Sequence, residues 1–195
     1  FTKEISKEDY ESINIQKQMK NWGYGKDKNT NRLINELLVL ACECYKGGMF
    51  ETYAQGYSKE CYIADISACY PAAMSTLLDL RGSKIEEGYG PPPTPEPHQM
   101  IFVRGTVDIP KGAIHTMAVH NPDKPAVTIR PWGQFETSYT WQEREFARQQ
   151  GAKFFNEYYI IVHTLGEKSP VAIGSDKLFA MRLDHMKKGL PTQYI

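Results

Sequence analysis

The sequence predicts an α+β fold, because helical and strand-like hydrophobic patterns occupy different parts of the chain. The stretch "NRLINELLVLACECY" (31–45) has apolar residues at helical spacing and runs into two glycines, which is typical of a helix end. Beyond residue 100, β-rich runs alternate with proline and glycine and indicate an antiparallel unit. The expected strands lie at 100–109, 114–120, 126–130, 134–140 and the end of 153–165, and the expected helices at 141–151 and, with amphipathic character, 176–189.

The region between these parts is predicted from shorter signals. Residues 49–66 read as two strands around a turn near Gly56, and 72–80 as a helix. The proline run "PPPTPEP" (91–97) is incompatible with a helix or a central strand. It is either a stiff connector, which is the commoner use of such runs, or a ligand for an aromatic groove.

Composition limits the classes of function. The 195 residues are 41% hydrophobic, which is enough for a substantial core. Lys plus Arg and Asp plus Glu number 23 each, so no overall basic excess indicates a nucleic-acid partner, although a local basic groove remains possible. No apolar run is long enough to cross a membrane, and no signal peptide opens the chain, so we expect a cytoplasmic location without membrane partners. The start at Phe1 suggests a piece of a longer protein.

The four cysteines do not form a common zinc pattern. Cys42 and Cys44 are separated by one residue, and Cys61 and Cys69 follow at long intervals, whereas zinc sites usually use paired C-x₂-C. Cys42 and Cys44 also lie on a predicted helix, where residues two apart point in different directions. We therefore expect reduced, mostly buried thiols.

Asp65 lies within "YIADI" (62–66), which we interpret as a short buried strand. An ionised carboxylate removed from water costs on the order of several kcal/mol unless a cation, a donor or a metal pairs with it. Neither Lys59 nor Lys84 lies at a spacing that fixes it beside Asp65. Two interpretations stay open from the residues alone: Asp65 caps the helix that Pro71 opens, or it binds a divalent metal.

Two short stretches resemble motifs of one enzyme family. "DISACYP" (65–71) resembles motif A of family B DNA polymerases, whose pattern is Asp, two variable residues, Ser, a variable residue, Tyr and Pro. Upstream, "YKGG" (45–48) resembles the Tyr-x-Gly-Gly motif of the protein-primed branch of that family, found in phages, adenoviruses and linear plasmids. Two motifs in this order are more specific than either alone. Ala68 replaces the family's Ser, and Cys69 replaces its usual Leu.

The resemblance implies nucleotidyl transfer assisted by two Mg²⁺ (or Mn²⁺) ions. It implies that Asp65 is the catalytic carboxylate and a metal ligand, and that the backbone carbonyl of Ile66 is a second ligand. Tyr70 would lie beneath the sugar of the incoming deoxynucleotide and exclude a 2′-hydroxyl, although an aromatic core residue is the alternative. Pro71 would fix the backbone at the helix start.

The upstream motif implies contacts with DNA. Tyr45 and Lys46 would contact a strand, while Gly47 and Gly48 would let the backbone approach it closely. The alternative is that these glycines only end a helix.

The family's other motifs are absent from the sequence. There is no Lys-x₃-Asn-Ser-x-Tyr-Gly, the motif B that holds the triphosphate, and no Asp-Thr-Asp, the motif C that supplies the second metal-binding carboxylate. We therefore expect a central polymerase fragment, inactive alone, which acts with the remaining polymerase segments on DNA template, primer, deoxynucleotides and a priming terminal protein. In a eukaryote, a nuclear or mitochondrial location would also fit.

The expected fold is then part of a polymerase palm followed by a β-rich insertion. The expected segments are 1–48, connecting an exonuclease domain to the palm; 49–90, the first part of the palm; 91–99, the connector; 100–175, an insertion that grips DNA and the terminal protein; and 176–195, a helix leading toward motif B. Two rival functions remain. One is a non-catalytic DNA- or terminal-protein-binding module, and the other an RNase H-type nuclease, for which no matching set of further acidic ligands stands out.

Overall fold

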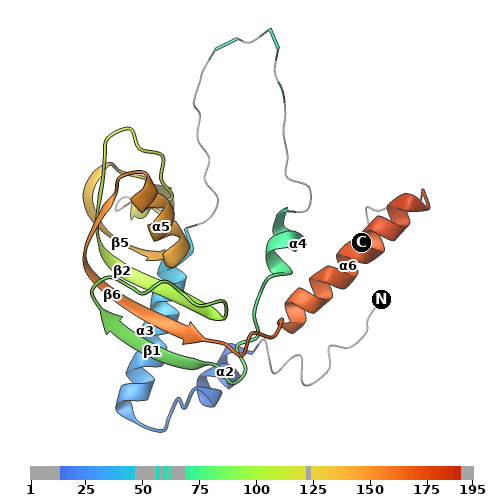
Figure 1. Ribbon diagram of the computed structural model, residues 1–195, viewed down its shortest axis with the longest axis horizontal. Coiled ribbons are helices and arrows are strands. Elements are labelled where there is room, and N and C mark those ends of the chain that lie inside the picture. Colours follow the sequence, from blue (N-terminus) through green and yellow to red (C-terminus); the bar gives the residue numbers. More distant parts are fainter. Residues whose placement is uncertain are drawn as a thin grey trace. The chain divides into compact units, whose positions relative to one another are not determined.

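The structure, a computed structural model, describes residues 14–46, 56–57, 59–60, 62, 69–121 and 124–189. These residues contain helices, a four-stranded antiparallel sheet and a two-stranded sheet, which confirms the predicted α+β class (Figure 1). The chain divides into two compact units. The first, called here the sheet unit, comprises residues 19–50 and 82–164; the second, called the helical unit, comprises residues 1–18, 51–81 and 165–195.

The sheet unit is built on an antiparallel sheet with strand order β1–β6–β2–β5. The strands are β1 (Lys84–Tyr89), β2 (Gln99–Ile109), β5 (Gly133–Thr140) and β6 (Lys153–His163). A separate two-stranded sheet pairs β3 (Val119–Asn121) with β4 (Lys124–Ile129). The predicted strands at 100–109, 126–130 and 134–140 are confirmed. The strand predicted at the end of 153–165 begins earlier, at Lys153, and the run 114–120 contributes only its last two residues to a strand.

Helix α3 (Lys28–Cys44) crosses one face of this sheet, and the shorter α2 (Ile15–Asn21) precedes it. Asp27 caps α3, because its carboxylate accepts hydrogen bonds from the backbone N–H and the hydroxyl of Thr30 at 2.8 and 2.6 Å. The buried residues of the helix repeat every third position, at Ile34, Leu37 and Leu40. One stripe of α3 therefore anchors it to the sheet.

The two faces of the sheet carry different helices. Alternate residues of β2, such as Val103 and Val107, join a buried cluster with Ala147 of α5 (Trp141–Gln149). Arg104 has the opposite parity and reaches Glu43 on α3. Because successive side chains of a strand point to opposite faces, α3 and α5 cover opposite sides of the sheet (Figure 1).

A buried ion pair lies on the α5 side. The guanidinium of Arg144 donates to both carboxylate oxygens of Glu157, at 2.6 and 2.8 Å, and the Tyr139 hydroxyl donates to the same carboxylate at 3.0 Å. Glu157 follows a β-bulge at which Asn156 adopts a positive φ of 52°, opposite Gly105. Burial, and then the neighbouring Glu157 carboxylate, raise the pKa of Tyr139, so the phenol stays protonated and donates.

The helical unit contains α4 (Cys69–Met74) and α6 (Pro170–Lys187). The helix predicted at 72–80 is wrong in extent. Ser75 and Thr76 donate their hydroxyls back to the carbonyls of the last turn, at 2.8 and 2.7 Å, and this competes with continued helix. The chain then becomes extended, and Leu78 forms a β-bridge with Lys168.

Helix α6 begins earlier than predicted, because Ser169 caps it and Pro170 is its first residue. The residues of α6 described as buried are the small Ala172 and Ser175. Within the predicted amphipathic stretch 176–189, the large apolar side chains Leu178, Phe179, Leu183 and Met186 are exposed and lie toward one side of the helix, whereas Ile173, before that stretch, is exposed on another side.

The three cysteines that the structure describes, Cys42, Cys44 and Cys69, are free, as expected, but they are not mostly buried; Cys61 lies outside the described residues. Cys42 and Cys69 are exposed, while Cys44 is partly covered. The different exposure of Cys42 and Cys44 follows from their separation by two helical positions. Burial, and next the negative charge of Glu143, raise the pKa of Cys44 to about 12, so its thiol stays protonated.

Candidate functional site

The upstream motif begins where α3 ends. Tyr45 is the C-cap of the helix, and its backbone N–H donates to the Cys42 carbonyl at 3.1 Å. The Tyr45 side chain is 81% exposed, so its ring is available to a partner. Lys46 is only partly exposed, and burial lowers the pKa of its ammonium. Gly47 and Gly48 lie outside the described residues.

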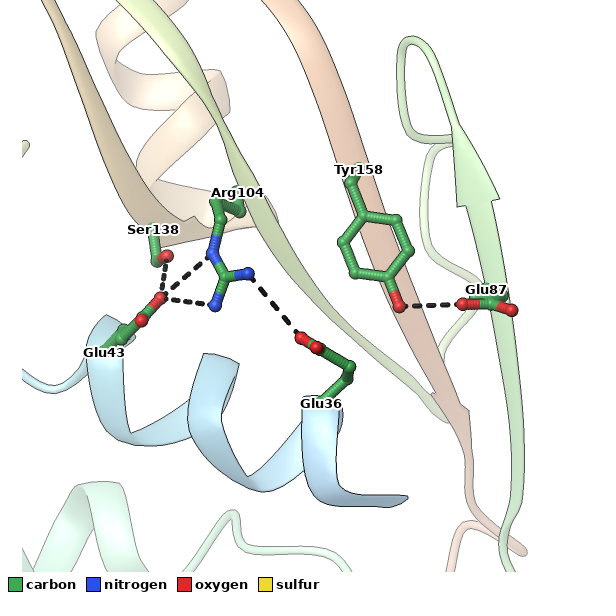
Figure 2. A network of polar contacts seen from close by, with 6 residues as sticks. All are labelled: Glu36, Glu43, Glu87, Arg104, Ser138 and Tyr158. Atoms are coloured by element: carbon green, nitrogen blue, oxygen red, sulfur yellow. Dashed lines mark hydrogen bonds and ion pairs between the residues drawn. The ribbon is translucent and has the colours of Figure 1, made fainter. Parts of the chain in front are cut away.

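A polar network centred on Glu43 joins the last turn of α3 to the sheet (Figure 2). One oxygen of Glu43 accepts from Arg104 of β2 at 2.9 and 3.2 Å, and from the Ser138 hydroxyl of β5 at 2.6 Å. Arg104 also approaches Glu36, which lies two helical turns before Glu43, at 3.6 Å. Partial burial works to raise the pKa of Glu43, but the hydrogen bonds from Ser138 and Arg104 prevail and lower it, so Glu43 stays ionised.

A surface pocket of about 260 Å³ lies beside this network. Its lining residues are Glu43, Lys46, Arg104, Val119, His120, Glu136, Thr137 and Ser138. The cations Lys46 and Arg104 face the carboxylates of Glu43 and Glu136 within it. The pocket is therefore close to electrically balanced and is not a simple trap for anions.

A second polar group on the same face of the sheet has the same chemistry. Glu87 of β1 accepts from the Tyr158 hydroxyl at 2.8 Å (Figure 2) and pairs with Arg32 in the first half of α3. The Arg32 hydrogen bond, followed by that of Tyr158, overcomes burial and lowers the pKa of Glu87. A carboxylate with one arginine and one hydroxyl thus joins α3 to the sheet at two places.

In the helical unit, Tyr70 lies in the first turn of α4 and is 81% exposed. It is therefore not packed as a core side chain within the described structure. The neighbouring Pro71 carbonyl accepts from the Ser175 hydroxyl of α6 at 3.0 Å, which fixes α4 against α6. A mainly apolar groove of about 370 Å³, with Met74, Leu178 and Phe179 in its lining, lies between these helices.

The expected metal ligands, Asp65 and Ile66, lie outside the described residues. Among the residues that the structure describes, no group of three or more His, Cys, Asp or Glu side chains is arranged to hold a metal ion. No helix in this part of the chain is long and apolar enough to cross a membrane.

Sequence reasoning did not identify Glu43, Arg104 or Ser138. Arg104 was detectable in principle, because it is a charged residue within the alternating β2 run "MIFVRGTVDI". Its partner was not, because Glu43 and Arg104 are separated by 61 positions in the sequence.

Among solved structures, the chain is similar to an orthorhombic crystal form of phi29 DNA polymerase, with a TM-score of 0.50 and 15% sequence identity. The similarity covers 87% of this chain and 32% of the polymerase chain, so this chain spans about a third of that protein's length. No protein-family model matches the sequence, and no curated protein matches it significantly. At this level of identity, the likeness shows that the chain shares its fold with part of a DNA polymerase.

Proposed function

We propose that the chain is a central segment of a DNA-directed DNA polymerase of the protein-primed family B. The observation that carries this proposal is a coincidence of sequence and fold. The stretches "YKGG" and "DISACYP" occur in the family's order in a chain whose fold resembles about a third of phi29 DNA polymerase. Either signal alone is weak, but they are independent of each other.

The proposed donor set fits a divalent metal. The Asp65 carboxylate and the Ile66 carbonyl both supply oxygen ligands, which Mg²⁺ and Mn²⁺ prefer. Asp65 also carries a negative charge, which a metal site uses and which a helix cap does not require. When bound, such ions supply activation of the attacking hydroxyl and neutralise the charge that develops on the transferred phosphoryl group. The chain's own contribution is to hold a carboxylate at a fixed position.

Tyr70 would act by excluding ribonucleotides and would take no part in the chemical step. Its exposed ring in the first turn of α4 is held by a short helix whose backbone is fixed by Pro71 and by the bond from Ser175. A rigid ring beneath the sugar leaves no space for a 2′-hydroxyl, so ribonucleotides are disfavoured. Tyr45 and Lys46 would contact the DNA strand, as ring and cation respectively.

The chain alone should not polymerise nucleotides. Two-metal transfer needs carboxylates from both sides of the site, and the sequence holds neither motif C nor motif B. A polymerase completed by segments carrying those motifs would extend a primer hydroxyl on a DNA template, starting from a hydroxyl of a terminal protein.

The test is primer extension by the 195-residue chain, first alone and then with the polypeptide encoded after it or in a neighbouring frame. Extension should require both parts and Mg²⁺ or Mn²⁺. Asp65→Asn should lower the rate of the chemical step by several orders of magnitude while DNA binding persists. Tyr70→Val should raise ribonucleotide incorporation relative to deoxyribonucleotide, with a modest effect on the natural substrate.

Tyr89→Val is the matched control, because Tyr89 is also exposed, at 78%, and lies outside both motifs. It should leave the ratio of ribonucleotide to deoxyribonucleotide incorporation unchanged. An unchanged ratio in Tyr70→Val would remove the proposed sugar contact. No extension by the folded, combined parts, together with binding of primed DNA, would favour the non-catalytic binding module.

A further inference from the structure

The last turn of α3 contains a carboxylate in a position that a helix disfavours. Glu43 lies one residue before the end of the helix, where the backbone carbonyls give the macrodipole its negative end, and the last turn contains no basic residue. Lys46, just beyond the helix, offers a local positive charge. A second cation comes from the sheet. Arg104 of β2 supplies it, and Ser138 of β5 adds a hydroxyl donor.

Polar contacts add to packing at this end of the helix. The fully buried side chains of α3 are Ile34, Leu37 and Leu40, and Cys44 in the last turn is partly buried beside the backbone of Val103 in β2. Next to it, Glu43 accepts hydrogen bonds from Arg104 and Ser138 of the sheet. The direction in which the chain leaves α3 toward Tyr45 and Lys46 thus depends in part on Glu43 and its donors.

We propose that Arg104, Glu43 and Ser138 position the Tyr45–Lys46 segment for contact with a DNA strand, as residues that act through that segment without touching the nucleic acid themselves. This inference rests on the proposed function for its ligand, a primed DNA template. The positioning itself is a property of the chain and is measurable without DNA.

The effect of Glu43→Gln on DNA affinity has opposite signs for positioning by Glu43 and for direct phosphate contact by Arg104. If Arg104 itself binds a phosphate, Glu43 competes for it, and Glu43→Gln strengthens DNA binding by releasing the guanidinium and removing a negative charge. If Glu43 positions the segment, Glu43→Gln weakens binding although the surface becomes more positive. Arg104→Leu weakens binding in both cases, so Glu43→Gln is the decisive variant.

The chain provides its own matched control at the other end of α3. Arg32 also joins α3 to a strand through a carboxylate, Glu87, which likewise accepts from a hydroxyl, that of Tyr158. Arg32→Leu therefore removes the same chemistry from the same helix and the same face of the sheet, 13 positions before Tyr45. A general loosening of α3 affects both variants, whereas positioning of Tyr45 and Lys46 affects Arg104→Leu and Glu43→Gln.

The experiment uses the full chain with a fluorescently labelled primed template, and measures its dissociation constant together with amide hydrogen exchange. We expect Glu43→Gln and Arg104→Leu to weaken binding severalfold and Arg32→Leu to leave it unchanged. Ser138→Ala should give a smaller effect, because Arg104 still holds Glu43. In the background of Lys46→Ala, Arg104→Leu should cost less affinity than it does in the wild type, because the group that it positions is gone.

Amide hydrogen exchange tests, without DNA, whether Glu43 and Arg104 hold the end of α3 in place. The Tyr45 amide, bonded to the Cys42 carbonyl, should exchange faster in Glu43→Gln and Arg104→Leu than in Arg32→Leu. Equal exchange in all three would overturn the positioning role even if the chain binds DNA. Tighter binding by Glu43→Gln would replace it with direct contact by Arg104. A wild-type chain that does not bind primed DNA, yet shows the difference in exchange, would remove the proposed ligand and keep the positioning.

Discussion

The buried pair of Arg144 and Glu157 gives the strongest prediction about stability. Their side chains are 14% and 3% exposed, and the guanidinium contacts both oxygens of the carboxylate. Arg144 also lies over the Phe154 ring, with its central carbon 4.8 Å from the ring centroid. Replacing Arg144 by Met keeps an unbranched apolar side chain but leaves the carboxylate with the Tyr139 hydroxyl as its described side-chain donor.

The size of the effect follows from the burial of the carboxylate. Removing one partner of a buried ion pair costs about 3–5 kcal/mol, because the remaining charge is desolvated without compensation. Lost cation–π attraction adds about 0.5–2 kcal/mol at such partly desolvated sites. A domain of this size is stable by about 5–15 kcal/mol, so Arg144→Met should remove a large part of that stability.

Urea unfolding followed by tryptophan fluorescence reports the loss of stability of the sheet unit. The three tryptophans, Trp22, Trp132 and Trp141, all belong to the sheet unit, which also contains Arg144 and Glu157. The control is Arg148→Met on the same helix, since Arg148 makes an equally well-formed but exposed pair with Glu145. It should leave the unfolding free energy nearly unchanged, because exposed pairs are screened by water.

Adding Glu157→Gln to Arg144→Met should recover much of the lost stability, because no charge then remains buried and the amide oxygen still accepts from Tyr139. A loss of stability in Arg144→Met no larger than that in Arg148→Met would contradict the desolvated charge as its cause. So would a double variant less stable than Arg144→Met alone, since the penalty would then come from lost packing.

Two further predictions concern the same unit. Gly105→Ala should destabilise the sheet unit by about 1–3 kcal/mol in urea unfolding. An added Cβ would lie 3.0–3.1 Å from the Tyr139 hydroxyl, the Glu157 side chain and the Phe155 carbonyl. An unchanged midpoint would show that the backbone at the bulge moves to accommodate the methyl group. Glu43 has a folded-state pKa below its ordinary 4.5, so its contribution is complete above that pH and is lost as the pH falls through the folded value. Glu43→Gln should therefore make the unfolding free energy depend less steeply on pH below about 5, and an unchanged slope would contradict the interaction with Arg104.

Local patterns in the sequence predicted most of the elements, because hydrophobic period and caps are properties of neighbouring residues. The helix over 31–45 and the strand over 100–109 are examples. Strand β1, "KIEEGY", was not predicted, because three of its residues are charged and its faces do not alternate cleanly between buried and exposed. It is a strand because its backbone pairs with β6 from Lys84 to Tyr89, which is information that its own residues do not carry.

The candidate site was predictable only in part, for the same reason. "YKGG" and "DISACYP" are contiguous, so they were visible in the sequence. The Glu43 network combines residues from α3, β2 and β5, and its members become neighbours only once the sheet has formed. Glu43 lies near the helix end with Lys46 three positions on as a local cation, so its neighbours in the sequence gave no sign of the pairing with Arg104.

Buried carboxylates elsewhere in the chain are paired without a metal. A buried carboxylate needs a partner, and the two buried carboxylates of the described residues both have one. Asp79 accepts from the guanidinium of Arg81 at 2.6 and 2.8 Å and from its backbone N–H at 2.9 Å, and Glu157 accepts from Arg144. In both cases an arginine neutralises the buried carboxylate: Arg81 lies two positions from Asp79, and Arg144 lies thirteen positions from Glu157. The proposed metal at Asp65 thus depends on the motif around it, and the loss of primer extension in Asp65→Asn is the measurement that decides it.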